Sequence, residues 1–183
     1  MRALQKALPA ARSGTLWGGE TAAANCGGQS GVTDTFIDGF WYLDQLGQFA
    51  QLNVSVFLRQ AFVAGGGYPL VEVNKSDASA PLLPLPDYYV ALLHKRLMGT
   101  RVLKMSSSAS NVRAYAHCAR SPSKGVAIAY LNIALNVTAS VTPPLQLQNA
   151  SAQREMYVEN PDYHCFIVRE SLAPFDLLPL TMS

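Results

Sequence analysis

The order of strand-like and helix-like segments between residues 15 and 99 constrains the fold more than any other feature of the sequence. Thr15–Trp17 is a short apolar run typical of a buried strand. In residues 54–58, valine and leucine alternate with serine and phenylalanine, which indicates a second strand with Arg59 and Gln60 at its carboxyl end.

A helix is expected between these strands, and another after the second strand. Thr33 or Asp34 can cap the first helix, and Gly47 is expected to end it. The second helix is expected over residues 87–98, after an exposed loop at residues 74–84. The order strand–helix–strand–helix is typical of a parallel α/β fold.

The pattern changes after Gly99, where short strand-like runs are separated by Ser, Asn, Pro and Lys-Gly stretches, as in an antiparallel sheet. The runs are Arg101–Met105, Val112–Cys118, Val126–Ile133, Arg154–Val158 and Cys165–Arg169. The sequence therefore predicts an α/β part in residues 1–99 and a β part in residues 100–183. Residues 1–13 are expected to form a helix or a frayed end.

Composition and charge exclude several functions. Charged residues make up 14% of the 183 residues and the formal net charge is +2, which does not indicate binding to nucleic acid. No apolar run reaches the roughly 18–20 residues that a membrane span needs, so no transmembrane segment is expected. Residues 1–13 lack a continuous apolar run, and no signal peptide is expected in this chain.

No cofactor and no metal site is expected. The cysteines Cys26, Cys118 and Cys165 show no Cys-x-x-Cys spacing and form no zinc pattern with the histidines. In the dipeptides His117-Cys118 and His164-Cys165, adjacent side chains on a strand point to opposite faces. Neither dipeptide is therefore placed to bind one metal.

Glu20 ends a short apolar run and is followed by small residues that lead to Gly27 and Gly28. Because a buried, unpaired carboxylate is costly, two interpretations are open. Glu20 is an exposed or ion-paired turn residue, or it lies at the carboxyl end of a strand with its carboxylate aimed into a sugar site. In the second case the backbone of Gly27 and Gly28 can approach a ligand, because glycine has no side chain in the way.

A series of motifs occurs in one order along the chain: Trp17–Thr21, Thr33–Phe36, Phe40–Gly47, Arg59-Gln60, Gly65–Tyr68, Leu85–Tyr89 and Leu97–Thr100. Together they resemble the heparanases, glycoside hydrolase family 79. The runs Phe-Trp-Tyr-Leu-Asp-Gln-Leu-Gly and Arg-Ala-Tyr-Ala-His-Cys look most like the plant heparanase-like branch. The likeness covers roughly residues 15–135.

This resemblance implies the domain organisation. Residues 1–99 would be the C-terminal portion of a (β/α)8 TIM barrel, its last two βα units, and residues 100–183 an incomplete antiparallel β-sandwich. A complete barrel takes about 250 residues, and residues 171–179 do not resemble the family's closing segment. Both ends look truncated, and a C-terminal fragment is expected.

The resemblance also implies the reaction chemistry. Glu20 matches the nucleophile of a retaining glycosidase, which works with a second carboxyl group as acid/base. In the family that second group lies in an Asn-Glu dipeptide, and this sequence contains none. Glu159-Asn160 has the reversed order and lies in the β part, so it is not a substitute. The acid/base is expected to be absent from the chain, which would be inactive alone.

The substrate-binding residues that the resemblance implies are Cys26, Gly27, Gln60, Gly66 and Tyr68. Gln60 matches a glutamine that contacts the substrate, and Gly66 and Tyr68 match the pair that holds a glucuronate carboxylate. Cys26 and Gly27 match a loop whose backbone amides face the substrate. Asn25 stands where mammalian heparanases show tyrosine, so that aromatic contact is not expected here.

Other interpretations stay open for the neighbouring residues. Tyr68 is alternatively a loop aromatic that packs on the sheet. Arg59 is expected to pair with a carboxylate in the barrel wall, because its side chain points away from that of the next residue. Trp41 and Tyr42 are expected in the core, whereas Trp17 is either a sugar platform or a packing residue.

Cys118 resembles a sandwich cysteine that, in some family members, is disulfide-bonded to the C-terminal segment. Cys165 is the candidate partner within the sandwich, and the sequence leaves open whether the two meet.

The resemblance implies a heparanase-like retaining hydrolase of β-linked glucuronides, in heparan sulfate-like or arabinogalactan-type glycans. The alternative is a non-catalytic carbohydrate-binding or pseudoenzyme remnant; a mispredicted gene model is a third possibility. The resemblance implies that the parent protein is secreted, lysosomal or vacuolar, and that it can be peripheral to a membrane. Four glycosylation sequons agree with that location, at Asn53, Asn74, Asn136 and Asn149.

Overall fold

The computed structural model describes residues 15–63, 67–77, 79–120, 125–134 and 136–139, and the backbone of residues 152–160, 163–170 and 180–181. The chain divides into two compact units, Met1–Tyr88 and Tyr89–Ser183. The expectations for residues 1–13 and 171–179 lie outside the described residues. The boundary between the units falls inside a helix, before the boundary at residue 99 that the sequence predicts.

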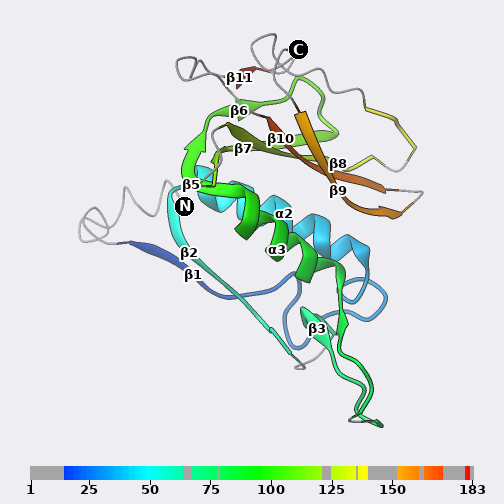
Figure 1. Cartoon of the computed structure of the whole chain (residues 1–183). Coiled ribbons are helices and arrows are strands. Elements are labelled where there is room, and N and C mark those ends of the chain that lie inside the picture. The colour runs from blue at the N-terminus through cyan, green and yellow to red at the C-terminus, as the bar shows by residue number, and fades with distance from the viewer. Residues whose placement is uncertain are drawn as a thin grey trace. The chain divides into compact units, whose positions relative to one another are not determined.

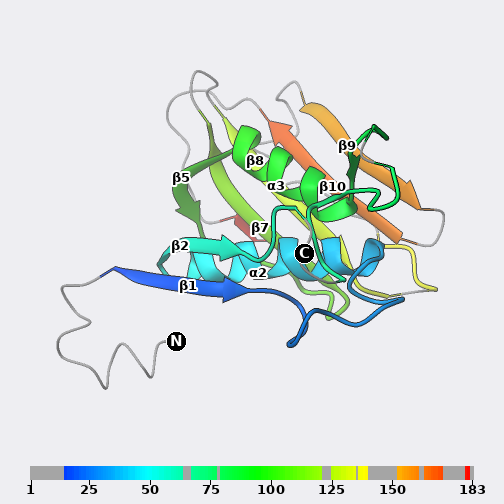
Figure 2. The ribbon, with the colours of Figure 1, turned by 90° about the horizontal axis from the view of Figure 1, so that it is seen from below.

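The first unit is built on two parallel strands, β1 (Leu16–Thr21) and β2 (Val54–Arg59), joined through helix α2 (Phe36–Gln51). Figure 2 shows the two strands side by side with α2 next to them. The rings of Tyr42 and Phe49 on α2 pack on Phe57 of β2, with centroid distances of 5.4 and 5.3 Å. The strand–helix–strand order is the one that the sequence predicts, and the complete barrel stays a prediction.

The bounds of α2 differ from the expected ones. The helix runs through Gly47, which is buried inside it, and continues to Gln51. Glycine inside a helix costs about 1 kcal/mol, and the packing of Phe49 on Phe57 in the added turn offsets that cost. The residue at the N-cap position is Thr35 rather than Thr33 or Asp34, which lie in the preceding turn and accept from the N–H groups of Gln29 and Gly31.

The remainder of the first unit is a long connection after β2. It contains the short antiparallel strands β3 (Val71–Glu72) and β4 (Leu83–Pro84) and leads into α3 (Pro86–Leu97), which crosses the boundary between the units. Residues 74–83 are mostly exposed where they are described, as the sequence predicts. Pro86 is the first residue of α3, where its missing N–H has no helical partner to lose.

The second unit is a five-stranded antiparallel sheet in the order β5-β7-β8-β10-β9 (Figure 1). Its strands are β5 (Met98–Leu103), β7 (Val112–Ala119), β8 (Val126–Asn132), β9 (Ala152–Asn160) and β10 (Tyr163–Glu170). A parallel pair joins β6 (Met105–Ser106) to β11 (Leu180–Thr181). The core is apolar and includes Met105, Ala114, Ala116, Val126, Ile128 and Tyr130. A second layer that would make this sheet a sandwich stays a prediction.

Candidate functional site

The carboxyl ends of β1 and β2 bring two of the predicted site residues to one edge. The strands are parallel, with Glu20 opposite Leu58 and Thr21 opposite Arg59. The backbone N–H of Gln60 donates to the carbonyl of Thr21 at 3.0 Å, which extends the pairing by one residue. In this register Gln60 is offset by two residues from Glu20, so both lie at the carboxyl ends of the pair, the edge where parallel α/β folds bind ligands.

Glu20 is exposed and belongs to β1 rather than to a turn. No residue in the described ranges forms an ion pair with it within 4.0 Å. Gly18, two residues earlier, faces α2, where an added Cβ would lie 2.5 Å from the ring of Phe49. One face of β1 thus packs on the helix at Gly18, whereas Trp17, 62% exposed, and Glu20 lie on the accessible side of the strand.

The loop after β1 is tied to the loop after β2. The N–H of Gly67 donates to the carbonyl of Gly27 at 2.5 Å, and the hydroxyl of Thr33 donates to the carbonyl of Gly67 at 2.8 Å. Gly28 has a φ of +90°, and a Cβ there would lie 2.5 Å from the Thr33 hydroxyl and 2.7 Å from the Tyr68 ring. The close approach that glycine permits at Gly28 is therefore an approach to protein atoms.

The remaining predicted substrate contacts have unequal exposure. Cys26 is exposed, with a positive φ of 54°, and Gly27 is partly exposed. Tyr68 is only 5% exposed, and its ring centroid lies 5.6 Å from the guanidinium carbon of Arg59. Packing is thus one role of Tyr68, as the alternative interpretation predicts. Gly66 lies outside the described residues.

Arg59 is the centre of a buried cluster beneath this edge. Its Nη2 atom lies 2.7 Å from Oδ2 of Asp38 on α2 and 2.5 Å from Oδ2 of Asp87 on α3, and these side chains are at most 4% exposed. The prediction that Arg59 pairs with a carboxylate is confirmed. The aromatic rings of Trp41 and Tyr42 also face the guanidinium, at 5.5 and 5.4 Å.

This cluster supports the loop that follows β2. The guanidinium of Arg59 donates to the backbone carbonyl of Gln60, in addition to its contact with the Tyr68 ring. A buried arginine with fixed partners therefore holds the backbone next to Glu20. Asp38 and Asp87 were not predicted from the sequence. A usable signal for Asp38 is its i, i+4 spacing from Tyr42, which puts both on the buried face of α2.

The carboxyl group of Asp38 has a raised pKa. Burial, together with the hydrogen bond and charge of Asp87, raises the pKa of Asp38 to about 8 against the opposing effect of Arg59. Asp38 therefore holds a proton at neutral pH, and Asp87 forms the shorter of the two contacts with Arg59. Burial also raises the pKa of the Tyr42 hydroxyl to about 12.

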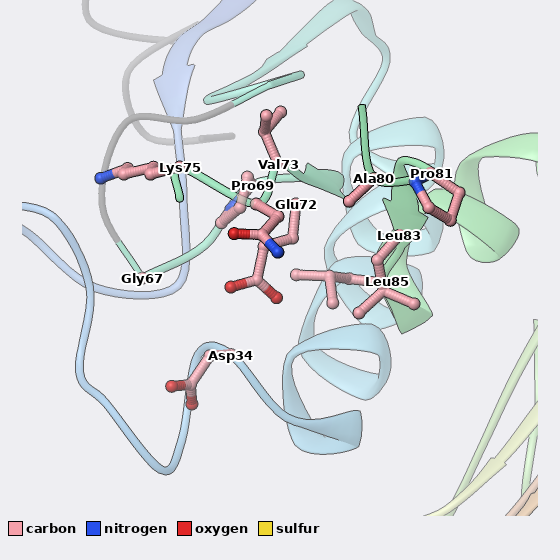
Figure 3. A pocket seen from close by; sticks show the side chains of 11 residues that line it. Asp34, Gly67, Pro69, Glu72, Val73, Lys75, Ala80, Pro81, Leu83 and Leu85 are labelled. Carbon is pink, nitrogen blue, oxygen red and sulfur yellow. The ribbon is translucent and has the colours of Figure 1, made fainter. Parts of the chain in front are cut away.

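A pocket of about 710 Å³ lies beside the tied loops (Figure 3). Its polar lining includes Asp34, Glu72, Asn74 and Lys75. The rest of its lining is Gly67, Pro69, Val73, Ala80, Pro81, Leu83 and Leu85. The carboxylate of Asp34 is held by the N–H of Gly31 at 2.7 Å and by the hydroxyl of Ser30 at 3.1 Å.

The described histidines of the second unit, His94 and His117, lie close together in its interior. Within the described residues, no group of three or more His, Cys, Asp or Glu side chains is close enough together to hold a metal ion. His117 and His94 contact each other edge to face at 5.5 Å, and Nδ1 of His117 lies 2.7 Å from the Gly99 carbonyl.

A disulfide between Cys118 and Cys165 does not fit the sheet. Cys118 pairs with Val126 on β8, and Cys165 pairs with Leu131 on the same strand, so they lie on opposite sides of β8 and at different rows. A disulfide needs Cα atoms about 4.4–6.8 Å apart, whereas one strand spacing alone is about 4.8 Å and each residue along the strand adds about 3.3 Å. Whether Cys118 and Cys165 meet was left open by the sequence, and the strand order indicates that they do not. Cys118 has a free thiol.

The sequons that the structure describes are accessible. Asn53, Asn74 and Asn136 are exposed, and Asn149 lies outside the described residues. Neither described helix is long and apolar enough to cross a membrane.

Glu20 and Gln60, at the carboxyl ends of β1 and β2, and Tyr68 in the following loop are thus the described residues of the predicted site that lie in one region of the first unit. The family model "Glycosyl hydrolase family 79, N-terminal domain" matches residues 1–47, which include β1 and most of α2. The resemblance that the motifs predict is confirmed, and the chain is a sequence relative of the heparanases and heparanase-like proteins of this family.

Plant and animal relatives are both similar to the chain. Baicalin-beta-D-glucuronidase of Scutellaria baicalensis is 44% identical over 117 residues, 63% of this chain and 21% of that protein. Heparanase-like protein 2 of Arabidopsis thaliana is 40% identical over 149 residues, covering 78% and 26%. Heparanase of Gallus gallus is 39% identical over 147 residues, covering 76% and 27%. The chain thus spans about a quarter of the length of these relatives.

Proposed function

We propose that this chain is the part of a heparanase-like retaining glycoside hydrolase that supplies the nucleophile and the loop facing a glucuronate. The observation that supports this most is the position of Glu20, exposed at the carboxyl end of β1, with Gln60 following the carboxyl end of the paired strand β2. The substrates would be β-linked glucuronides of heparan sulfate-like or arabinogalactan-type glycans. The names of the relatives, heparanase and baicalin-beta-D-glucuronidase, agree with glucuronide chemistry.

The reaction would be a double displacement. The carboxylate of Glu20 attacks the anomeric carbon and forms a glycosyl ester, while a second carboxyl group protonates the departing oxygen. Water, deprotonated by that second group, then displaces Glu20, and the sugar leaves with its configuration retained. The second carboxyl group would come from outside these residues, because no glutamate of the chain follows an asparagine. No glycosidase activity is therefore expected of the chain by itself.

The amide of Gln60 would donate to and accept from sugar hydroxyls. The exposed backbone at Cys26 and Gly27 would offer N–H groups to the substrate. The phenol of Tyr68 would reach a glucuronate carboxylate only from its mostly buried position. Arg59 contacts both the Gln60 carbonyl and the Tyr68 ring. These contacts fit a binding site in which the positions of Gln60 and Tyr68 have to be fixed.

The burial of Tyr68 is also the observation that favours the alternative, a non-catalytic carbohydrate-binding or pseudoenzyme remnant. We place the parent protein in the secretory pathway, outside the cell or in a lysosome or vacuole, where the exposed sequons at Asn53, Asn74 and Asn136 would be glycosylated.

The test is the binding of two simple sugars to the purified chain, labelled with ¹⁵N and followed by NMR. Methyl β-D-glucuronide is expected to shift the signals of the Gln60 side-chain amide and the Gly67 and Tyr68 backbone amides. Methyl β-D-glucoside, which lacks the carboxylate, is expected to bind more weakly. Equal binding of the two sugars, or no shift at these residues, would contradict the proposal.

A further inference from the structure

We propose that the pocket between Asp34, Gly67, Glu72 and Leu83 holds the group attached to the glucuronate, and that it accepts an uncharged, apolar group better than a sulfated one. This inference deepens the proposed function and rests on it, because it concerns the same substrate. It makes Glu72 a residue that determines specificity.

The pocket is lined in part by the two connections that leave the carboxyl ends of β1 and β2, the ends at which Glu20 and Gln60 lie. Asp34 belongs to the connection that leaves the carboxyl end of β1, and Gly67 belongs to the connection that leaves the carboxyl end of β2. Gly67 belongs both to the pocket and to the glycine loop, since it lines the pocket and precedes Tyr68 in the sequence. A substrate whose glucuronate reaches this loop therefore has the pocket next to it.

One wall of the pocket is apolar and open to solvent. It comes largely from the segment that contains β4, where Leu83 is 57% exposed and lies close to Pro81 and Leu85. Pro69 and Val73 add apolar surface from the segment around β3. Leucine exposed to this degree gains free energy when another apolar group covers it. A volume of about 710 Å³ is enough for an aromatic ring system.

Two carboxylates also line the pocket, and one of them, Glu72, pairs with Leu83 across the β3–β4 ladder, so it lies next to the apolar wall. Figure 3 shows the Glu72 carboxylate directed toward the side where Asp34 lies, and the Lys75 ammonium pointing away from the leucines. The Asp34 carboxylate is fixed by Gly31 and Ser30 and does not turn away easily. A sulfate group placed here meets two carboxylates, Asp34 and Glu72, and one ammonium, Lys75, so the charged part of the lining is negative on balance. At about 6 Å in water, repulsion by one carboxylate weakens binding about threefold.

The test compares two probes that differ by one charge, phenyl β-D-glucuronide and 4-sulfophenyl β-D-glucuronide, titrated against the ¹⁵N-labelled chain. The phenyl probe is expected to shift the amides of Leu83 and Leu85 together with that of Gly67, and to bind at least threefold more tightly than the sulfophenyl probe. Glu72→Gln is expected to reduce this preference by about threefold. Asp44→Asn, the same loss of charge outside the pocket lining, is expected to leave the preference unchanged.

A second variant tests the apolar wall. Leu83→Asp is expected to weaken binding of the phenyl probe and leave methyl β-D-glucuronide binding unchanged. Shifts at Tyr68 without shifts at Leu83 and Leu85, or a preference that Glu72→Gln does not change, would overturn the pocket assignment alone. No binding of any glucuronide, methyl β-D-glucuronide included, would overturn the proposed function and the pocket with it.

Discussion

Arg59, the last residue of β2, forms an ion pair with Asp87 in the first turn of α3, with 2.5 Å between Nη2 and Oδ2 and with both side chains almost fully buried. The same guanidinium supports the Gln60 carbonyl and the Tyr68 ring. A buried pair like this adds little net stability, but removing one partner leaves a buried charge without compensation. The pair therefore ties the geometry of the candidate site to the charge state of the core.

Asp87→Asn is expected to lower the free energy of unfolding by about 3–5 kcal/mol, because Arg59 then lacks its ionised partner. Urea denaturation followed by circular dichroism measures this at pH 6. Asp38→Asn is the matched control, since it makes the same change at a carboxyl group that already holds a proton. A control variant that loses as much stability as Asp87→Asn would refute this division of charge.

The raised pKa of Asp38 gives the chain a defined pH dependence. The pKa rises from 3.8 to about 8 on folding, so between these values the folded chain holds a proton that the unfolded chain has released. The contribution of Asp38 to the free energy of unfolding is fully present below about pH 4. It is lost as the pH rises toward 8, by at most about 1.4 kcal/mol per pH unit. Asp38→Asn is expected to remove this slope in unfolding curves recorded from pH 5 to 9. An unchanged slope in the variant would mean that another group is responsible.

His94 is expected to act in the opposite direction. Burial, assisted by the charge of His117, lowers the pKa of His94 from 6.5 to about 4. Its contribution is therefore present above about pH 6.5 and is lost as the pH falls toward 4. His94→Gln is expected to flatten the acid side of the stability profile, measured by thermal unfolding between pH 4 and 7. A variant as acid-sensitive as the parent chain would contradict this role.

The sequence predicts the order of the elements well and the buried charges poorly. The strands ending at Glu20 and Arg59 are recognisable because apolar runs leave a local pattern, and their parallel pairing brings Glu20 and Gln60 to the same edge. The spacing of Asp38 from Tyr42 indicates only that Asp38 is on the buried face of α2, whereas its meeting with Asp87 depends on Arg59, which contacts both carboxyl groups and is distant from them in the sequence. The helix end at Gly47 was wrong for a similar reason, because a distant contact of Phe49 extends the helix.

Tyr68→Phe separates the two roles of the tyrosine. The ring stays on Arg59, so the free energy of unfolding is expected to change little. Loss of the hydroxyl is expected to weaken methyl β-D-glucuronide binding by about 0.5–1.5 kcal/mol, a typical neutral hydrogen bond. The measurement is the ratio of glucuronide to glucoside affinity in the variant and in the parent chain. A ratio that does not change would assign Tyr68 to packing only.

The central claim is that Glu20 is the nucleophile, and covalent labelling tests it most directly. The longer protein that contains this chain would be treated with a mechanism-based 2-deoxy-2-fluoro β-glucuronide, digested and analysed by mass spectrometry. The glycosyl ester is expected on Glu20, and Glu20→Gln is expected to abolish both labelling and turnover while sugar binding persists, because an amide keeps the shape but does not attack the anomeric carbon. A label on any other residue, or labelling and turnover that survive Glu20→Gln, would contradict the account.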